Sequence, residues 1–358
     1  MDLVAPFPYF GGKRKVAPAV WARFGAVRNY VEPFCGSAAM LLGAPDGKRT
    51  ETINDADGFV ANFWRAVRHA PDEVARHADY PVIEADLEAR HAWLVNRSER
   101  LRWQLEDPDF YDAKIAGWWA WGACAWIGSG WCSGTGPHHT TGARLVDARK
   151  LPHLSAGQGI NRQLPHVGNA GQGINRQLPH VGDAGQGINR QLPHVGNAGR
   201  GINRQLPHLS EGRGEFIRSW MDALGERLRD VRVACGDWER VLSSSVTTRH
   251  GLTAVFLDPP YAKGSMDYAA GGVGTDLSAR VMEWCAEHGD DPAFRIALCG
   301  HADEHSLSGW TSVGWSQKGY AKTDAAKANA RSETIWFSPH CIPVHTEAQL
   351  PLASGASA

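Results

Sequence analysis

The segment Asp258-Pro259-Pro260-Tyr261 carries the residue types in this chain best suited to chemistry. It follows the apolar run 254–257, which is typical of a buried strand. Two consecutive prolines end such a strand, because neither can donate a ladder hydrogen bond. The result is a rigid turn at the carboxyl end of a strand, where open α/β sheets bind their ligands. A carboxylate, a fixed carbonyl and an aromatic ring there suit a planar base with an exocyclic amino group, although the same four residues alone could be a plain strand-terminating turn.

Three other predicted strands end in glycine or acidic residues. These ends are Glu32-Pro33-Phe34-Cys35-Gly36, Asn54-Asp55 and Gly236-Asp237-Trp238. A doubly wound sheet binds a nucleoside cofactor with a glycine turn after one strand and an acid after the next, which accepts from ribose hydroxyls. The glycine turn has neither the G-x-G-x-x-G pattern of dinucleotide sites nor the G-x-x-x-x-G-K-[ST] loop of nucleoside triphosphatases. Acidic residues at the strand ends, without a phosphate-binding loop, fit an adenosine that carries no phosphates. S-adenosylmethionine is such a molecule.

Strands that alternate with helices on both sides of a long insertion predict the fold class. We expect strands near 30–34, 52–55, 231–235, 254–257, 294–299 and 331–338, and helices near 16–24, 59–67, 216–228 and 277–287. This pattern indicates a Rossmann-like α/β sheet, mixed and mostly parallel, that is interrupted by an inserted helical and repeat-containing domain. The expected divisions are a first catalytic segment over 1–70, an insert over 71–214 (helical over 71–127), a second catalytic segment over 215–342 and a disordered tail over 343–358.

Residues 151–210 form an internal repeat. Leu-Pro-His recurs five times and Gly-Ile-Asn-Arg-Gln four times, with a spacing of 13 residues once and 14 thereafter. Glycine and proline in every copy exclude a coiled coil. Arginine, asparagine and glutamine contact base edges and phosphates, so Arg162, Arg176, Arg190 and Arg204 are candidate nucleic-acid contacts. A flexible insert that grew by tandem duplication explains the copies equally well.

Two further places are candidates for contact with a nucleic acid. Trp131 lies in a loop rich in glycine and serine, and we expect it to be exposed for stacking on a base. The neighbouring tryptophans of 118–126 fit a helical core face better. Lys318, Lys322 and Arg331 cluster in a predicted loop and could contact phosphates, with a solvated loop as an equal alternative.

Taken in order, these elements resemble the Dam-type family of DNA adenine methyltransferases. The similar segments are Pro8-Tyr9-Phe10-Gly11-Gly12-Lys13, the turn 30–37, Asn54-Asp55, Cys235-Gly236-Asp237-Trp238 and the Asp258–Tyr261 turn. The resemblance covers the first seventy residues and roughly 215–340. It implies a site-specific enzyme that transfers a methyl group from S-adenosylmethionine to the N6 amino group of an adenine flipped out of double-stranded DNA.

The resemblance also assigns roles to particular residues. It implies that the cofactor is bound by Tyr9, Lys13, Glu32, Phe34, Gly36, Asp55, Asp237 and Trp238. Lys13 would lie near the methionine carboxylate, Asp55 at the ribose and Asp237 at the adenine amino group of the cofactor. Asp258 and the Pro259 carbonyl would accept the amino hydrogens of the target adenine while Tyr261 stacks on its ring, which makes Asp258, Pro259, Pro260 and Tyr261 the expected catalytic residues.

Departures from the family pattern leave alternatives open. The turn has Gly36-Ser37-Ala38 where the family usually has Gly-x-Gly, and the repeat is foreign to the family, so no target sequence is implied. Methylation of cytosine N4, a catalytically inactive DNA-binding homologue, and an RNA or protein-glutamine substrate are the alternatives. A companion restriction endonuclease and the oligomeric state also stay open.

Composition sets the remaining expectations. Lys and Arg total 37 against 38 for Asp and Glu, so any basic surface must be local. Seven cysteines without a C-x-x-C pair are typical of reduced thiols in the cytoplasm, where we expect the protein. Cys124, Cys132, His138 and His139 fit no familiar zinc spacing, so we expect no metal. No signal peptide and no apolar run long enough to cross a bilayer are evident, so we expect no membrane association.

Overall fold

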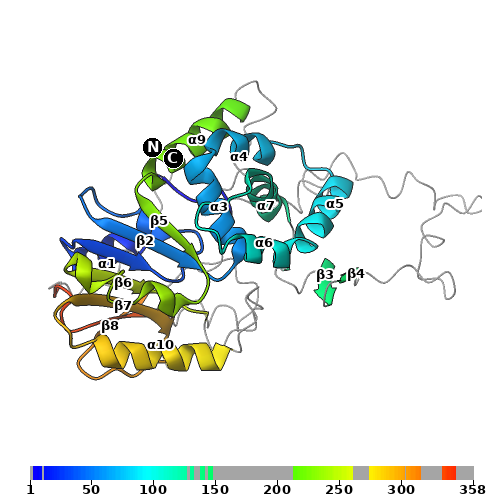
Figure 1. Ribbon diagram of the computed structural model, residues 1–358. Helices are drawn as coiled ribbons and strands as arrows, with labels where there is room; N and C mark the ends of the chain where they lie inside the picture. The colour runs from blue at the N-terminus through cyan, green and yellow to red at the C-terminus, as the bar shows by residue number, and fades with distance from the viewer. Residues whose placement is uncertain are drawn as a thin grey trace, which may run out of the picture.

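The computed structural model describes residues 3–9, 12–126, 130–132, 138–141, 144–147, 213–260, 274–302, 304–315 and 333–343. Within these ranges, seven strands form one sheet in the order β5-β2-β1-β6-β7-β9-β8 (Figure 1). Their bounds are β1 Asn29–Glu32, β2 Thr50–Asp55, β5 Val231–Cys235, β6 Thr253–Leu257, β7 Phe294–His301, β8 Thr311–Trp315 and β9 Glu333–Phe337. β5, β2, β1, β6 and β7 are parallel, whereas β9 runs antiparallel to β7 and to β8. The expected mixed, mostly parallel α/β sheet is therefore confirmed.

The strand order reverses between β1 and β6. From β1 the chain adds β2 and β5 on one side, and then β6 and β7 on the other side. β1 and β6 are buried along their whole length, as expected for central parallel strands that are covered on both faces. An open α/β sheet binds its ligand at such a reversal, outside the carboxyl ends of the strands. The fold thus directs attention to the residues that follow β1, β2, β5 and β6.

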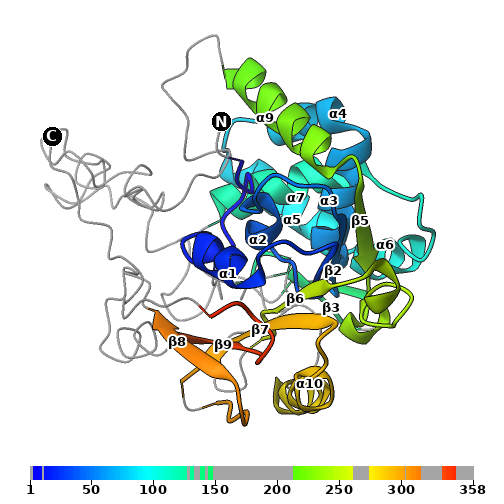
Figure 2. The same cartoon turned by 90° about the vertical axis from the view of Figure 1, so that its left-hand side faces the viewer.

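Helices cover both faces of the sheet. Their bounds are α1 Ala17–Phe24, α2 Ala39–Leu42, α3 Gly58–His69, α4 Pro71–Ala78, α5 Glu84–Val95, α6 Ser98–Gln104, α7 Ala113–Ala125, α9 Arg213–Leu228 and α10 Gly274–His288. α3, α4, α7 and α9 pack together near the β5 side of the sheet, and α10 lies near β7 at the other side (Figures 1 and 2). No helix in the described ranges is long and apolar enough to span a membrane.

Alternating side chains divide the central strands between two hydrophobic cores. Tyr30 and Phe256 point into the larger core, which also includes α1, α3 and α7. Val31 and Val255 point into the smaller core beneath α10. Both faces of β1 and β6 are therefore packed, which holds their carboxyl ends in fixed positions.

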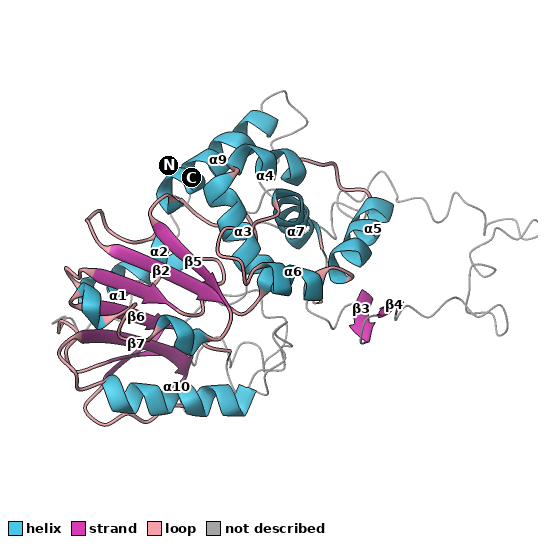
Figure 3. Ribbon diagram, viewed as in Figure 1, coloured by secondary structure: helices cyan, strands magenta, loops and turns pink. Residues whose placement is uncertain are grey.

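Some elements differ from the expectations. The strand β8 was not predicted, and neither was the hairpin of β3 His138–Thr141 and β4 Arg144–Asp147, drawn apart from the main sheet in Figure 3. The expected strand at 331–338 is described only from Glu333. The inserted recognition domain and the domain bounds stay predictions. Several predicted parts lie outside the described residues: the repeat with Arg162, Arg176, Arg190 and Arg204, the residues Tyr261, Lys318, Lys322 and Arg331, and the tail from residue 344.

Candidate active site

The ends of three neighbouring strands are held together by one buried amide. Asn54, at the end of β2, donates from Nδ2 to the carbonyls of Pro33 and Gly236, each at 3.0 Å. Pro33 follows β1 and Gly236 follows β5, so this side chain links the loops on either side of its own strand. The backbone adds Cys35 N to Asn54 O at 2.9 Å. The glycine turn and the two predicted acidic ends therefore form one unit at the carboxyl edge of the sheet.

Asp55 lies directly beneath the glycine turn. Its Oδ2 accepts a hydrogen bond from Gly36 N at 2.9 Å, and its Oδ1 accepts from Asp57 N at 2.9 Å. Burial raises the pKa of the Asp55 carboxyl to about 7, with a further contribution from the Asp57 charge, although these backbone donors oppose the shift. The residue expected to hold the ribose is thus beside the turn expected to hold the cofactor.

The turn has no room for a side chain at Gly36. Gly36 has φ +44°, and a Cβ atom there would lie 2.3 Å from the ring of Tyr9. Trp64 Nε1 donates to the Gly36 carbonyl at 2.9 Å and closes the other side. Ala38, which stands where the related family usually has glycine, adopts the left-handed conformation with φ 48° and ψ 34°. The alanine therefore takes the backbone conformation that glycine adopts most easily.

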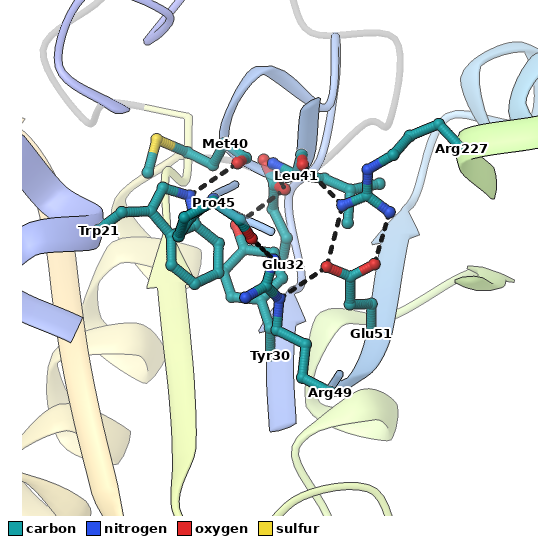
Figure 4. A network of polar contacts seen from close by, with 9 residues as sticks. All are labelled: Trp21, Tyr30, Glu32, Met40, Leu41, Pro45, Arg49, Glu51 and Arg227. Carbon is teal, nitrogen blue, oxygen red and sulfur yellow. Dashed lines mark hydrogen bonds and ion pairs between the residues drawn. The ribbon is translucent and has the colours of Figure 1, made fainter. Parts of the chain in front are cut away.

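Glu32 is hydrogen-bonded to the segment that follows the glycine turn. Its side chain is buried, and its Oε2 accepts from the hydroxyl of Tyr30 at 2.9 Å and from the backbone N–H of Leu41 at 3.2 Å (Figure 4). Burial raises its pKa to about 8, and both hydrogen bonds oppose that shift. Because Leu41 belongs to α2, the helix that follows the glycine turn, Glu32 is placed to position the turn.

Arg227 of α9 is hydrogen-bonded to the same residue of α2 as Glu32. Its Nη2 donates to the Leu41 carbonyl at 2.9 Å, and its guanidinium forms two hydrogen bonds with Glu51, at 2.6 and 2.9 Å (Figure 4). Arg49 also donates to Glu51, at 2.8 Å. A four-residue helix makes few bonds of its own, so these side chains supply the order that α2 lacks.

The segment after β5 combines an aromatic pair with an ion pair. Trp238 is buried, and its ring stacks on Phe34 with a centroid distance of 5.8 Å and an interplanar angle of 28°. The Asp237 carboxylate accepts from Glu239 N at 2.9 Å and pairs with Arg280 at 3.2 Å. Phe34 and Trp238, which come from different strand ends, thus lie together, with the half-exposed Asp237 beside them.

Lys13 connects the amino-terminal segment to the predicted catalytic turn. Its side chain is buried, and its Nζ lies 2.9 Å from Asp258 Oδ1 and 3.9 Å from Glu333 Oε2. Burial alone would lower the pKa of Lys13, but the nearby charges of Asp258 and Glu333 outweigh it and raise the pKa above its usual value. The ring of Trp315 is 5.7 Å from Nζ. Lys13 was expected near the methionine carboxylate of the cofactor, and the structure shows it on Asp258.

The proline turn begins where the sequence indicated. β6 ends at Leu257, Asp258 and Pro260 are half-buried, and Pro259 is buried. Glu333 is a participant that the sequence reasoning did not identify, because no motif marks it. It becomes a neighbour of Lys13 only because β9 pairs with β7, which places Glu333 opposite His301.

Trp131 is packed against the helices of the middle region. Its ring stacks on His91 at 4.9 Å, and its Nε1 donates to the Trp119 carbonyl at 3.1 Å. A Cβ atom on Gly122 would lie 1.9 Å from the ring, so α7 fits closely against it. Stacking of Trp131 on a base stays a prediction, and it would require the ring to leave these contacts.

A comparison with protein families found a match for residues 9–106. This span matches the family model described as D12 class N6 adenine-specific DNA methyltransferase. It runs from Tyr9 through the glycine turn and Asp55 to the end of α6. A search of curated proteins found no match. The family match confirms the resemblance to the Dam-type enzymes and indicates an adenine-specific DNA methyltransferase.

Proposed function

From the premise that the chain is an adenine-specific DNA methyltransferase, we propose that it transfers a methyl group from S-adenosylmethionine to the N6 atom of an adenine flipped out of double-stranded DNA. The observation that carries the proposal is the placement of four functional segments on the adjacent strands β5, β2, β1 and β6, at the reversal of strand order. A cofactor and a target base that bind side by side need such neighbouring strand ends.

The residues at this edge fit the cofactor. The absence of a side chain at Gly36 lets the Tyr9 ring, 37% exposed, lie against the turn, where it could contact a ligand. In this proposal Asp55 accepts hydrogen bonds from the ribose hydroxyls, and Asp237 accepts one from the adenine amino group of the cofactor. Bound S-adenosylmethionine would supply an electrophilic methyl group on a sulfonium ion.

The other residues predicted to bind the cofactor also have roles in this proposal. Phe34 and Trp238 form an aromatic wall near Asp237. Glu32 acts through α2, which it bonds at Leu41, and so positions the turn without touching the ligand. Lys13 reaches from the amino-terminal segment to Asp258, which supports a place for it between the proposed cofactor and target-base positions.

Asp258 and Pro259 carry the chemistry of the target amino group. The Asp258 carboxylate and the Pro259 carbonyl each accept a hydrogen bond from this amino group. These hydrogen bonds localise the nitrogen lone pair and stabilise the positive charge that develops during transfer. Lys13 lies near two carboxylates, so the three side chains together carry a net negative charge when both carboxylates are ionised. This negative charge favours the positive charge that develops on the target amino group. Alignment of the nitrogen with the methyl group supplies much of the remaining acceleration. Tyr261 is proposed to stack on the base.

The identity of the modified base tests the proposal. Purified protein, S-adenosylmethionine and unmethylated DNA are incubated, and the DNA is digested to nucleosides for mass spectrometry. We expect N6-methyladenine. Detection of N4-methylcytosine would favour the cytosine alternative, and failure of the protein to bind S-adenosylmethionine in calorimetry would favour the inactive DNA-binding alternative.

We also propose that DNA is contacted by the basic residues of the insert and of the carboxyl-terminal region. The candidates are Arg162, Arg176, Arg190, Arg204, Lys318, Lys322 and Arg331. The four arginines are supported by the local excess of arginine over acids in 151–214, and Lys318, Lys322 and Arg331 by their clustering in the sequence. Such side chains bind phosphates, and arginine also binds base edges. Deletion of one 14-residue repeat unit should change DNA affinity or site choice. Unchanged affinity and site choice would favour an inert insert.

A further inference from the structure

The ammonium group of Lys13 lies between two carboxylates at unequal distances. Asp258 Oδ1 is within hydrogen-bond distance at 2.9 Å, whereas Glu333 Oε2, at 3.9 Å, is close enough for an ion pair but too far for a hydrogen bond. Lys13 is only 3% exposed. A buried ammonium that loses its carboxylate partner is strongly destabilised. A change that draws Asp258 toward another donor therefore favours a movement of Lys13 toward a second carboxylate.

Glu333 has the features of that second partner. Its Oε2 is buried and has no hydrogen-bond partner among the described residues. Its backbone is held in the sheet, because β9 pairs Glu333 with His301 on one side and with Trp315 on the other. A movement of the ammonium by roughly 1 Å would bring it within hydrogen-bond distance of Oε2. The backbone of Glu333 is thus held by the sheet, and its buried oxygen is about 1 Å beyond hydrogen-bond distance from the ammonium.

The proposed reaction brings a second donor to Asp258. Asp258 must accept a hydrogen from the target amino group, yet its Oδ1 already accepts from a cation at 2.9 Å. A carboxylate that stays paired with an ammonium is a weaker acceptor for a second, neutral donor. The rate of transfer should therefore depend on how easily Lys13 leaves Asp258.

We propose that Glu333 is a positioning residue that receives the Lys13 ammonium when the target amino group engages Asp258. This inference rests on the proposed function and adds a residue that belongs to none of the recognised motifs. Glu333 acts only through Lys13 and need not touch the cofactor or the base. Its loss should slow the transfer step without a matching loss of binding.

Single-turnover methylation of a DNA substrate by Glu333→Gln tests the inference. Glutamine keeps the size and one acceptor oxygen but removes the charge, so we expect the transfer rate to fall about tenfold or more. The dissociation constants for S-adenosylmethionine and DNA should stay within about twofold of those of the unmodified protein. Glu333→Asp should be intermediate, since its charge remains but lies farther from Lys13. The exposed Glu283→Gln on α10 is the matched control and should leave the rate unchanged.

A double-mutant cycle shows whether Glu333 acts through Lys13. In a Lys13→Met background, Glu333→Gln should have no further effect on the transfer rate. An unchanged rate for Glu333→Gln, or an equal fall in both backgrounds, would overturn the inference. Absence of methylation by the unmodified protein would instead reject the proposed function, so the two failures are distinguishable.

Discussion

The Asp55 carboxylate accepts a hydrogen bond from the backbone N–H of Gly36 at 2.9 Å, across the ends of β2 and β1. The acid expected at the ribose and the glycine of the cofactor turn are therefore one structural unit. Any distortion of Gly36 changes the position of Asp55, and Tyr9 closes the turn from outside. The turn is consequently sensitive to very small changes in its residues.

Gly36→Ala should disable the turn. The new Cβ meets the Tyr9 ring and stands on a residue with φ +44°, so we expect the free energy of unfolding to fall by about 1–3 kcal/mol and cofactor affinity to fall at least tenfold. Urea denaturation and calorimetry measure the two effects. Ala38→Gly is the matched control, because its left-handed backbone suits glycine, and it should change stability by no more than about 1 kcal/mol. Equal damage from both variants would refute the explanation.

Asp258→Ala should abolish methyl transfer while it leaves DNA binding largely intact. Loss of the acceptor for the amino hydrogens should lower the single-turnover rate by about 10²-fold or more. DNA affinity, measured by fluorescence anisotropy, should stay within about twofold of the unmodified value. The exposed Asp290→Ala serves as control. Retained activity of Asp258→Ala would reject its catalytic role.

Arg227→Met should weaken both the fold and cofactor binding. The variant leaves the buried Glu51 with Arg49 alone and removes a donor from the Leu41 carbonyl, so we expect a loss of about 3 kcal/mol in the free energy of unfolding. Arg229→Met removes an exposed ion pair with Glu226 and should change stability by less than about 1 kcal/mol. Urea denaturation measures the free energy of unfolding of both variants. Similar losses in the two variants would show that Arg227 has no special role.

Stability should depend on pH through Glu32. Its pKa is raised from an ordinary value near 4.5 to about 8 by burial, so the folded state binds the proton more tightly than the unfolded state. The contribution is fully present below pH 4.5 and is lost as pH rises toward 8. Relative to Glu32→Gln, the free energy of unfolding should thus fall with pH by up to about 1.4 kcal/mol per unit in this window. Parallel pH profiles of the two proteins would contradict the assignment.

Local patterns predicted most of the strands and the edge that carries the site. Val231–Cys235 was predicted with its observed bounds, and the apolar run before Asp258 ends at the prolines as expected. Such segments are recognisable because burial on both faces requires continuous apolar residues and proline ends a ladder. The link between Asp258 and Lys13 was not predicted, although both residues were singled out.

The missed features depend on contacts between distant segments. β8 was overlooked because its residues Thr311–Trp315 are mostly exposed and include serine and glycine, which gives no strong strand pattern. Glu333 gains its place only through pairing of β9 with β7 and β8. Trp131 was expected to be exposed from its glycine-rich surroundings, but His91 and α7 pack against it. Local composition does not encode such contacts.

Long-read methylation mapping of host DNA tests the central claim most directly. Cells that express the unmodified chain are compared with cells that express Asp258→Ala. We predict N6-methyladenine within one recurring short sequence in the first culture and its absence in the second. N4-methylcytosine, no modified base with the unmodified chain, or methylation that persists with Asp258→Ala would contradict the account.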